Sequence, residues 1–174
     1  VRQNHIGDWG TPFGMLIEHL LEVGEDSAEA GLLVTDHNAF YQAARTKFDT
    51  AEKAEPAGSA GDFNVRSRNR VVKLQAGDPE TLKHWHDLVR MSKAYFNKVY
   101  STLGVTLTDD DLAGESTYND HLAAVCEELE AKGIATMSDG ALCVFLEGYT
   151  GREGKPVPLI IRKSDGGYNY GTTD

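Results

Sequence analysis

Apolar residues recur at helical spacing along the N-terminal part of the chain. Between residues 13 and 24 they stand three or four positions apart, which predicts an amphipathic helix that ends near Gly24. A second helix is expected after Asp36, because aspartate is a favourable N-cap. Its buried side should carry four apolar residues, Phe40, Tyr41, Ala44 and Phe48.

The clearest helical pattern covers residues 78–104. Asp78 and Pro79 suit a helix N-terminus, and Gly104 suits the end. The expected apolar stripe consists of Leu82, Trp85, Val89, Phe96 and Val99. Another helix is predicted from Tyr118 to Lys132, closed by Gly133.

Three segments show patterns that predict β-structure. Val105 and Leu107 suggest a short strand, and after Gly133 the apolar period changes to two. Asp139-Gly140 stands between two apolar runs and predicts a hairpin. Residues 157–170 repeat the pattern around Asp165-Gly166, which predicts a second turn of this kind.

The composition suits one domain, since 174 residues with 40% hydrophobic content can bury a core. A net charge of −10 argues against bulk attraction of nucleic acid. The basic cluster within residues 66–73 is interpreted as the solvated face of a helix, with a phosphate-contact strip as the alternative. Cys126 and Cys143 lack metal-ligand spacing and favour free thiols in a reducing, cytoplasmic location. No apolar run is long enough to span a membrane.

Three short motifs invite functional readings that their spacing does not support. His5-Ile6-Gly7-Asp8 falls one residue short of the HIGH tetrapeptide, and Asp8 places a negative charge where a polyphosphate would lie. Residues 90–94 resemble KMSKS, a motif that binds ATP phosphates from a mobile loop. Here they continue the helical spacing of the long predicted helix, so their backbone N–H groups are used inside that helix. His84 and His86 are two positions apart on that helix, so they point in different directions and cannot clamp one metal ion. No bound metal is predicted.

Ordered segments along nearly the whole chain resemble the arginyl-tRNA synthetase family of class I aminoacyl-tRNA synthetases. The first is "RQNHIGDWGTPFGMLIEHL", and the most specific are "SDGALCVFLEG" and "PLIIRKSDGGYNYGTTD". The resemblance implies that the HIGH signature lies upstream of Val1 and KMSKS downstream of Asp174, since this sequence holds neither. Pro12 departs from the glutamine that the family usually shows there, which removes any polar role at this position.

The resemblance implies an α/β fold: part of a Rossmann-like class I catalytic domain, with helical segments and an inserted β-hairpin connective region. We expect residues 1–174 to be a portion of that domain, with the insertion at about 105–165 and no second complete domain. Val1 and the strand around "LIIRK" should then belong to a parallel sheet with open edges, through which the fragment would self-associate.

The implied activity is ATP-dependent activation of L-arginine and its transfer to tRNA(Arg), with Mg²⁺ accompanying ATP. A fragment without the two signatures is expected to be inactive alone. The remaining alternative is a stand-alone, non-catalytic arginine-binding or regulatory paralogue.

Three residues match family positions that bind arginine. Glu115 and Asp174 would accept hydrogen bonds from the guanidinium, the α-amino group being a second group that one of them could bind, and Tyr170 would flank the guanidinium. Tyr170 and Asp174 share a face if a helix begins near Thr172 or Thr173. The structural alternatives are a helix-end carboxylate for Glu115 and a core tyrosine for Tyr170.

His5, Asp8 and Trp9 are expected near the same cleft, at the end of a parallel strand. Their individual roles stay open from the sequence. For His5, a structural hydrogen bond that orients the loop and a substrate contact are equally compatible with its position.

Overall fold

The computed structural model describes residues 2–54, 59, 61–151 and 154–174. The chain divides into two compact units, Val1–Gly114 and Glu115–Asp174, which are described in turn.

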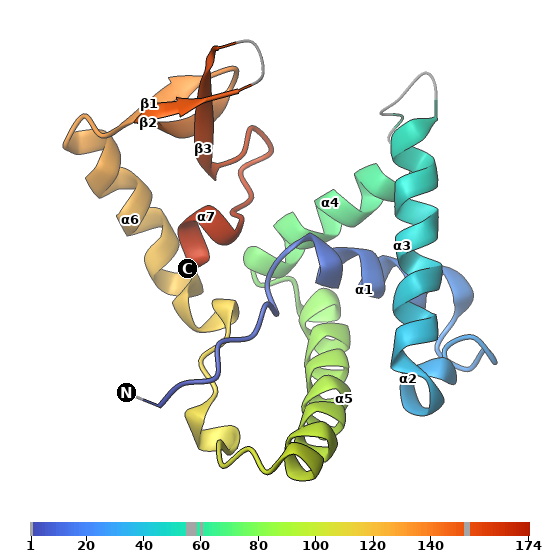
Figure 1. Ribbon diagram of the computed structural model, residues 1–174. Helices are drawn as coiled ribbons and strands as arrows, with labels where there is room; N and C mark the ends of the chain where they lie inside the picture. The colour runs from blue at the N-terminus through green and yellow to red at the C-terminus, as the bar shows by residue number, and fades with distance from the viewer. Residues whose placement is uncertain (1, 55–58, 60, 152–153) are drawn as a thin grey trace. The chain divides into compact units, whose positions relative to one another are not determined.

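The first unit is built from helices (Figure 1). After an extended N-terminal segment come α1 (Thr11–Val23), α2 (Leu32–Thr35), α3 (His37–Lys53), α4 (Phe63–Gln75) and α5 (Pro79–Leu103), followed by the 3-10 turn η1 (Asp109–Asp111). The helices predicted from residue 13, after Asp36 and over 78–104 are confirmed. No strand forms at 105–107, where the backbone is irregular and Val105 is exposed.

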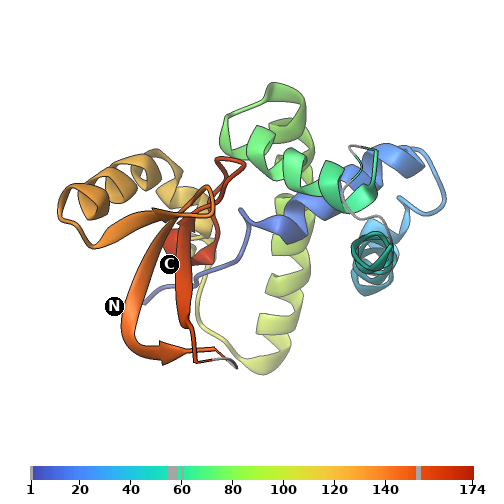
Figure 2. The same cartoon turned by 90° about the horizontal axis from the view of Figure 1, so that it is seen from above.

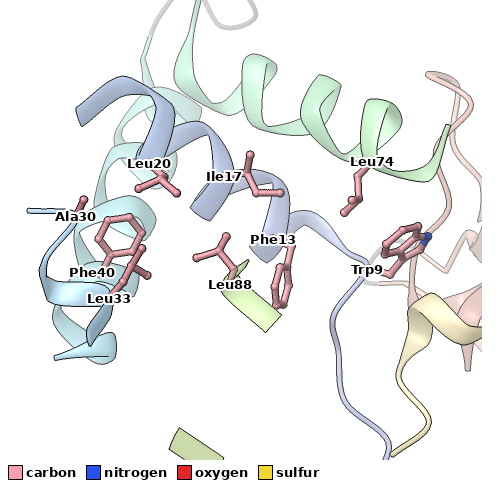
Figure 3. Close-up of a cluster of buried hydrophobic side chains, with 9 residues drawn as sticks. All are labelled: Trp9, Phe13, Ile17, Leu20, Ala30, Leu33, Phe40, Leu74 and Leu88. Atoms are coloured by element: carbon pink, nitrogen blue, oxygen red, sulfur yellow. The ribbon is translucent and has the colours of Figure 1, made fainter. Parts of the chain in front are cut away.

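Side chains from every helix of this unit fill its main core (Figure 3). Phe13, Ile17 and Leu20 project from one face of α1 toward Phe40 of α3 and Leu88 of α5. A smaller cluster, consisting of Met15, Ala44, Phe48 and Phe63, joins α1, α3 and the start of α4. The buried side predicted for α3 is confirmed, with Tyr41 only partly covered.

The ends of the two long helices follow capping chemistry. The Asp36 carboxylate accepts a hydrogen bond from the backbone N–H of Ala39 at 3.0 Å. The Asp78 carboxylate accepts hydrogen bonds from the Thr81 hydroxyl at 2.6 Å and from the Thr81 N–H at 2.9 Å, and these two bonds, the hydroxyl first, lower the pKa of Asp78. Gly104 ends α5 in the left-handed conformation, at φ 70°.

The buried face of α5 differs from the expected stripe. Thr81, His84 and Leu88 are buried, whereas Leu82, Trp85 and Val89 are only partly covered and Val99 is exposed; residues 90–94 lie inside the helix, as predicted. The stripe was misplaced because the other helices cover only the N-terminal half of α5. His84 is buried and His86 exposed, so they lie on different sides of the helix.

The basic residues of α4 make ion pairs with neighbouring helices. Arg66 and Arg70 both reach the Glu18 carboxylate of α1, with Nε–oxygen distances of 3.0 and 3.1 Å. Arg68 pairs with Glu52 of α3. The sequence-based reading of a merely solvated face is therefore wrong for these three arginines, because their partners lie on helices that are distant in sequence.

The second unit places a small sheet against a helix. It contains the 3-10 turn η2 (Glu115–Tyr118), α6 (Asn119–Ala131), three strands and the single turn α7 (Tyr170–Thr173). The strands β1 (Ala135–Ser138), β2 (Ala141–Thr150) and β3 (Pro156–Arg162) form one antiparallel sheet in the order β1-β2-β3 (Figure 2). The helix predicted to end before Gly133 is confirmed.

The first predicted hairpin is confirmed in detail. Ser138 pairs with Ala141, so the loop is the dipeptide Asp139-Gly140, and both loop residues have positive φ, 49° and 81°. This is the backbone that a type I′ turn requires.

Two β-sheet predictions are wrong. The chain turns tightly at Asp165-Gly166, with the Lys163 N–H donating to the Gly167 carbonyl at 2.9 Å, but no strand follows. The "LIIRK" segment lies largely in β3, which pairs antiparallel with β2. Among the described residues the parallel pairing is a single bridge between Asn4 and Leu112, within the first unit.

The core of the second unit joins α6 to the inner face of the sheet. It consists of Cys126, Ala135, Leu142, Val144 and Ile161. Both cysteines are free and buried, and burial raises the pKa of the Cys126 thiol. In the described parts of the chain, every helix is too short or too polar to cross a membrane.

Candidate functional site

The C-terminal segment of the second unit holds two of the predicted site residues at one helical turn. The Asn169 side chain accepts a hydrogen bond from the Gly171 N–H at 3.2 Å and so caps α7. The helix therefore begins at Tyr170, earlier than the predicted start at Thr172 or Thr173. Asp174 closes the turn, since its N–H donates to the Tyr170 carbonyl at 3.1 Å.

The two threonines of α7, Thr172 and Thr173, attach this helical turn to the rest of the second unit. The Thr172 hydroxyl donates to the backbone carbonyl of Ile161 in β3, and Thr173 is buried. Tyr170, in contrast, is 69% exposed. The alternative of a core tyrosine is therefore wrong, and the ring of Tyr170 is available to a ligand or to another part of the protein.

Glu115 opens η2, the short turn that leads into α6, and η2 contacts α7. The contact places a carboxylate oxygen of Glu115 within 4.8 Å of one of Asp174. Two carboxylates this close raise the local negative potential, and a cation that contacts both relieves their mutual repulsion. Glu115 also stands at a helix end, so the interpretation as a helix-end carboxylate is compatible with its position.

The three candidate residues of the first unit, His5, Asp8 and Trp9, lie within the extended N-terminal segment that precedes α1. His5 Nδ1 lies 2.9 Å from the Ala113 carbonyl, a hydrogen bond that requires the proton on Nδ1. This contact favours the loop-orienting role for His5, since it ties residues 4–5 to the stretch after η1. The neighbouring Asn4 N–H donates to the Asp111 carbonyl at 2.7 Å in the same ladder.

Asp8 and Trp9 are both buried, at 4% and 5% exposure. The Asp8 carbonyl accepts a hydrogen bond from the indole N–H of Trp85 at 2.7 Å. The two indole rings meet edge to face, with centroids 5.0 Å apart. A Cβ at Gly114 would lie 2.7 Å from the Asp8 carboxylate, so any larger residue there would force the Asp8 side chain to move. These contacts make Asp8 and Trp9 anchors of the loop that precedes α1.

Pro12 is the second residue of α1, a position where proline is well tolerated because its missing N–H is not needed. At this position it helps to start the helix. The polar role that the resemblance suggested for position 12 is therefore replaced by a conformational one.

Sequence reasoning missed two residues that shape the site. Asn169 sets the start of α7, and its signal is the Asx residue two positions before a glycine whose N–H it accepts. Gly114 permits the close approach of Asp8, but a close approach leaves no local signal in the sequence.

These features are those of a class I aminoacyl-tRNA synthetase catalytic domain. A family model described as "tRNA synthetases class I (R), catalytic domain" matches residues 1–174, and the chain belongs to this family. The match to this family confirms the α/β fold class that we expected from the sequence.

The relatives that the chain matches within this class are arginine–tRNA ligases. The chain is 71% identical to an arginine–tRNA ligase of Thermobifida fusca (strain YX) and 48% identical to one of Streptomyces avermitilis; each match covers 100% of this chain and 29% of the relative. The crystal structure of arginyl-tRNA synthetase from Plasmodium falciparum superimposes with a TM-score of 0.66 at 30% identity, over 99% of this chain and 26% of that one. The chain therefore spans less than a third of the length of these proteins.

Proposed function

We propose that this chain supplies the arginine-binding part of an arginine–tRNA ligase, which activates L-arginine with ATP and transfers it to tRNA(Arg). The family and the names of the relatives support this function. The observation that carries the proposal is the pairing of Glu115 and Asp174, with their carboxylate oxygens within 4.8 Å of each other.

The chemistry of the pair suits arginine. A guanidinium has five N–H donors in a planar fork, and carboxylates accept two of them side by side. One carboxylate would hold the guanidinium, while the second would hold its other edge or the α-amino group. Tyr170, exposed on the same turn as Asp174, would cover the guanidinium plane with its ring.

ATP enters as a second substrate in its Mg²⁺ complex, and tRNA(Arg) as the acceptor. The 174-residue sequence contains neither HIGH nor KMSKS, and its net charge is −10. Without those phosphate-binding groups, the isolated chain should show no arginine-dependent ATP–pyrophosphate exchange.

A cytoplasmic location accompanies this function, because two buried free thiols are typical of a reducing compartment. Self-association stays a prediction. The sheet order leaves one edge each of β1 and β3 without a strand partner in the described sheet, which favours pairing with another chain.

The test uses the complete ligase that contains this chain. Glu115→Gln keeps the shape of the side chain and removes its charge. A charge-assisted hydrogen bond contributes about 1.5–3 kcal/mol, so the KM for arginine should rise about ten- to a hundredfold while the KM for ATP changes little. Asp174→Asn should behave alike, and Tyr170→Phe should cost less, because the ring remains.

Matched controls are the exposed carboxylates Glu147 and Asp120 of the same unit, neutralised as Glu147→Gln and Asp120→Asn. Neither should alter the KM for arginine. An unchanged arginine KM in Glu115→Gln, together with a lower Tm, would assign Glu115 to the helix end and refute the proposal. Arginine binding without any exchange activity in the complete protein would instead identify the non-catalytic paralogue, for which no observation speaks at present.

A further inference from the structure

The single turn α7 needs contacts outside itself to hold its position. A helix of four residues is not stable alone in water. The Tyr170 and Asp174 side chains are exposed and add little packing. Where these two residues lie therefore depends on the contacts that the residues between them make with the rest of the second unit.

Thr172 ties the turn to β3. Its hydroxyl donates a hydrogen bond to the backbone carbonyl of Ile161. The side chain of Ile161 is 2% exposed and belongs to the core of the second unit, so this carbonyl has a fixed place. The register of β3 with β2 also shifts at Ile161, because Ile160 and Arg162 pair with consecutive residues of β2. A residue at such an irregularity stands outside the regular ladder, which makes its carbonyl available to a side chain.

At Gly171 the backbone of the turn lies directly against β3. A Cβ added there would lie 3.1 Å from the Ile160 carbonyl oxygen and 3.0 Å from a methyl group of Leu159, both closer than the 3.4 Å at which ordinary contacts begin. The φ of Gly171 is not positive, so space and not backbone conformation favours glycine at this position. An added methyl group would therefore separate the turn from the strand by a few tenths of an ångström.

Glu115 is fixed to the same core by a different route. It opens η2, which runs directly into α6, and α6 contributes the buried Cys126 to the cluster that contains Ile161. Asp174 is connected to this cluster through Thr172 and β3. The separation of the two carboxylates, whose oxygens lie within 4.8 Å of each other, is therefore set by how α7 is seated on β3.

We propose that Thr172 is a positioning residue of the arginine site, and that its hydroxyl, together with the close approach at Gly171, sets the place of Asp174 relative to Glu115. This inference rests on the proposed function. Two carboxylates hold a planar guanidinium only when their oxygens face its N–H groups, so a displaced turn binds arginine more weakly. Thr172 acts through Asp174 and does not need to contact the substrate.

The test compares two substitutions of Thr172 in the complete ligase. Thr172→Val keeps the branched shape and removes the hydroxyl, so the KM for arginine should rise about three- to tenfold while the KM for ATP stays unchanged. Thr172→Ser keeps the hydroxyl and should raise the arginine KM by less than about twofold. Thr136→Val is the matched control, since Thr136 is exposed on β1, and it should change neither KM.

Gly171→Ala displaces the turn without removing a hydrogen bond. Alanine is a better helix former than glycine, so α7 itself is not weakened. A misplacement of a few tenths of an ångström should raise the arginine KM about two- to fivefold and leave the KM for ATP unchanged. Should Thr172→Val fail to fold, this variant decides the matter, and an unchanged arginine KM in a folded Gly171→Ala ligase refutes the proposal.

A double-mutant cycle tests whether Thr172 acts through Asp174. Thr172→Val should raise the arginine KM by a smaller factor in an Asp174→Asn ligase than in the unmodified one, because the carboxylate that the hydroxyl positions is then already uncharged. Equal factors in the two backgrounds would show that Thr172 acts independently of Asp174, against the proposal.

The remaining outcomes separate this inference from the proposed function. If Glu115→Gln raises the arginine KM and Thr172→Val does not, the arginine site stands and the positioning role of Thr172 is wrong. A lower Tm in Thr172→Val with an unchanged arginine KM has the same meaning, because the hydroxyl then contributes to stability alone. An arginine KM that Glu115→Gln leaves unchanged would refute the proposed function and this inference with it.

Discussion

Helix α1 packs closely on α4 at Gly14. A Cβ added at Gly14 would lie 2.4 Å from the Ser67 carbonyl oxygen and 2.5 Å from a methyl group of Val71. Ordinary contacts of this kind begin at 3.4 Å, so Gly14→Ala forces the helices apart by about 1 Å. The contact with Ser67 is to backbone, which no side-chain rotation relieves.

The magnitude follows from two opposing effects. Overpacking a well-packed interface costs about 1–3 kcal/mol. Alanine is favoured over glycine inside a helix by about 1 kcal/mol, which offsets part of this cost. Because the contact with the Ser67 backbone cannot be relieved by a side-chain rotation, we expect a cost in the upper half of that range, about 2–3 kcal/mol. The net loss is then about 1–2 kcal/mol, which corresponds to a Tm lower by roughly 2–8 °C for a chain of this size.

The assay is thermal unfolding followed by tryptophan fluorescence. The chain has two tryptophans, Trp9 and Trp85, and both lie in the first unit, so the signal reports on that unit alone. Gly61→Ala is the matched control, because a Cβ there meets nothing within 4 Å and should leave Tm unchanged or slightly raised. An equal or higher Tm for Gly14→Ala would refute the reasoning that α1 and α4 touch at this glycine.

Two further predictions concern Glu18 and His19, two titratable residues of α1. Glu18→Gln should destabilise the first unit by about 2–3 kcal/mol in urea unfolding, because Arg70 is only 11% exposed and loses the nearer of its two carboxylate partners, keeping only the exposed Glu80 at 3.7 Å; an effect below 1 kcal/mol would contradict this. Burial, followed by the charge of Lys47, lowers the pKa of His19 against the opposing effect of Glu29. Below pH 6.5 the unfolded chain therefore binds a proton that the folded chain does not, so stability falls as the pH drops from there toward the folded pKa. His19→Phe should lose less stability than the unmodified chain between pH 7.5 and about 5.5, and identical losses would refute this.

Local chemistry accounts for what could be predicted from the sequence. Asp36, Asp78 and Gly104 act at helix ends through contacts with residues a few positions away, so their roles can be predicted from the sequence. The same holds for Asp139-Gly140, because a type I′ turn depends on two residues and their flanking strands.

One of the failures has a local cause and the others have a non-local cause. Asp165-Gly166 repeats the dipeptide, but the segment after it is capped into α7 by Asn169 and does not continue as a strand. Glu18, the partner of Arg66 and Arg70, lies 48 and 52 positions away from them, so the sequence offered no indication that these arginines are paired. The buried face of α5 likewise depends on where other helices happen to cover it.

The candidate site also has features that the sequence predicts and features that depend on non-local contacts. The resemblance nominated Glu115, Tyr170 and Asp174, whereas their proximity depends on the contact of η2 with α7, which the helical period does not encode. The resemblance also placed Asp8 near the cleft. The carboxylate of Asp8 is buried against Gly114, and its backbone carbonyl is engaged by Trp85.

The contrast among these three carboxylates bears on which of them can serve a ligand. Asp8 is buried, at 4% exposure, so little of its surface is accessible to a cation from solvent. Glu115 and Asp174 keep part of their surface exposed, lie at the ends of one-turn helices and stand within 4.8 Å of each other. A guanidinium that contacts both carboxylates would lower their mutual repulsion, and glutamine in place of Glu115 would remove that attraction while keeping the shape of the side chain. A structural role at the start of η2 would instead affect Tm and leave the affinity for arginine unchanged, so the arginine KM of Glu115→Gln is the measurement that distinguishes the two.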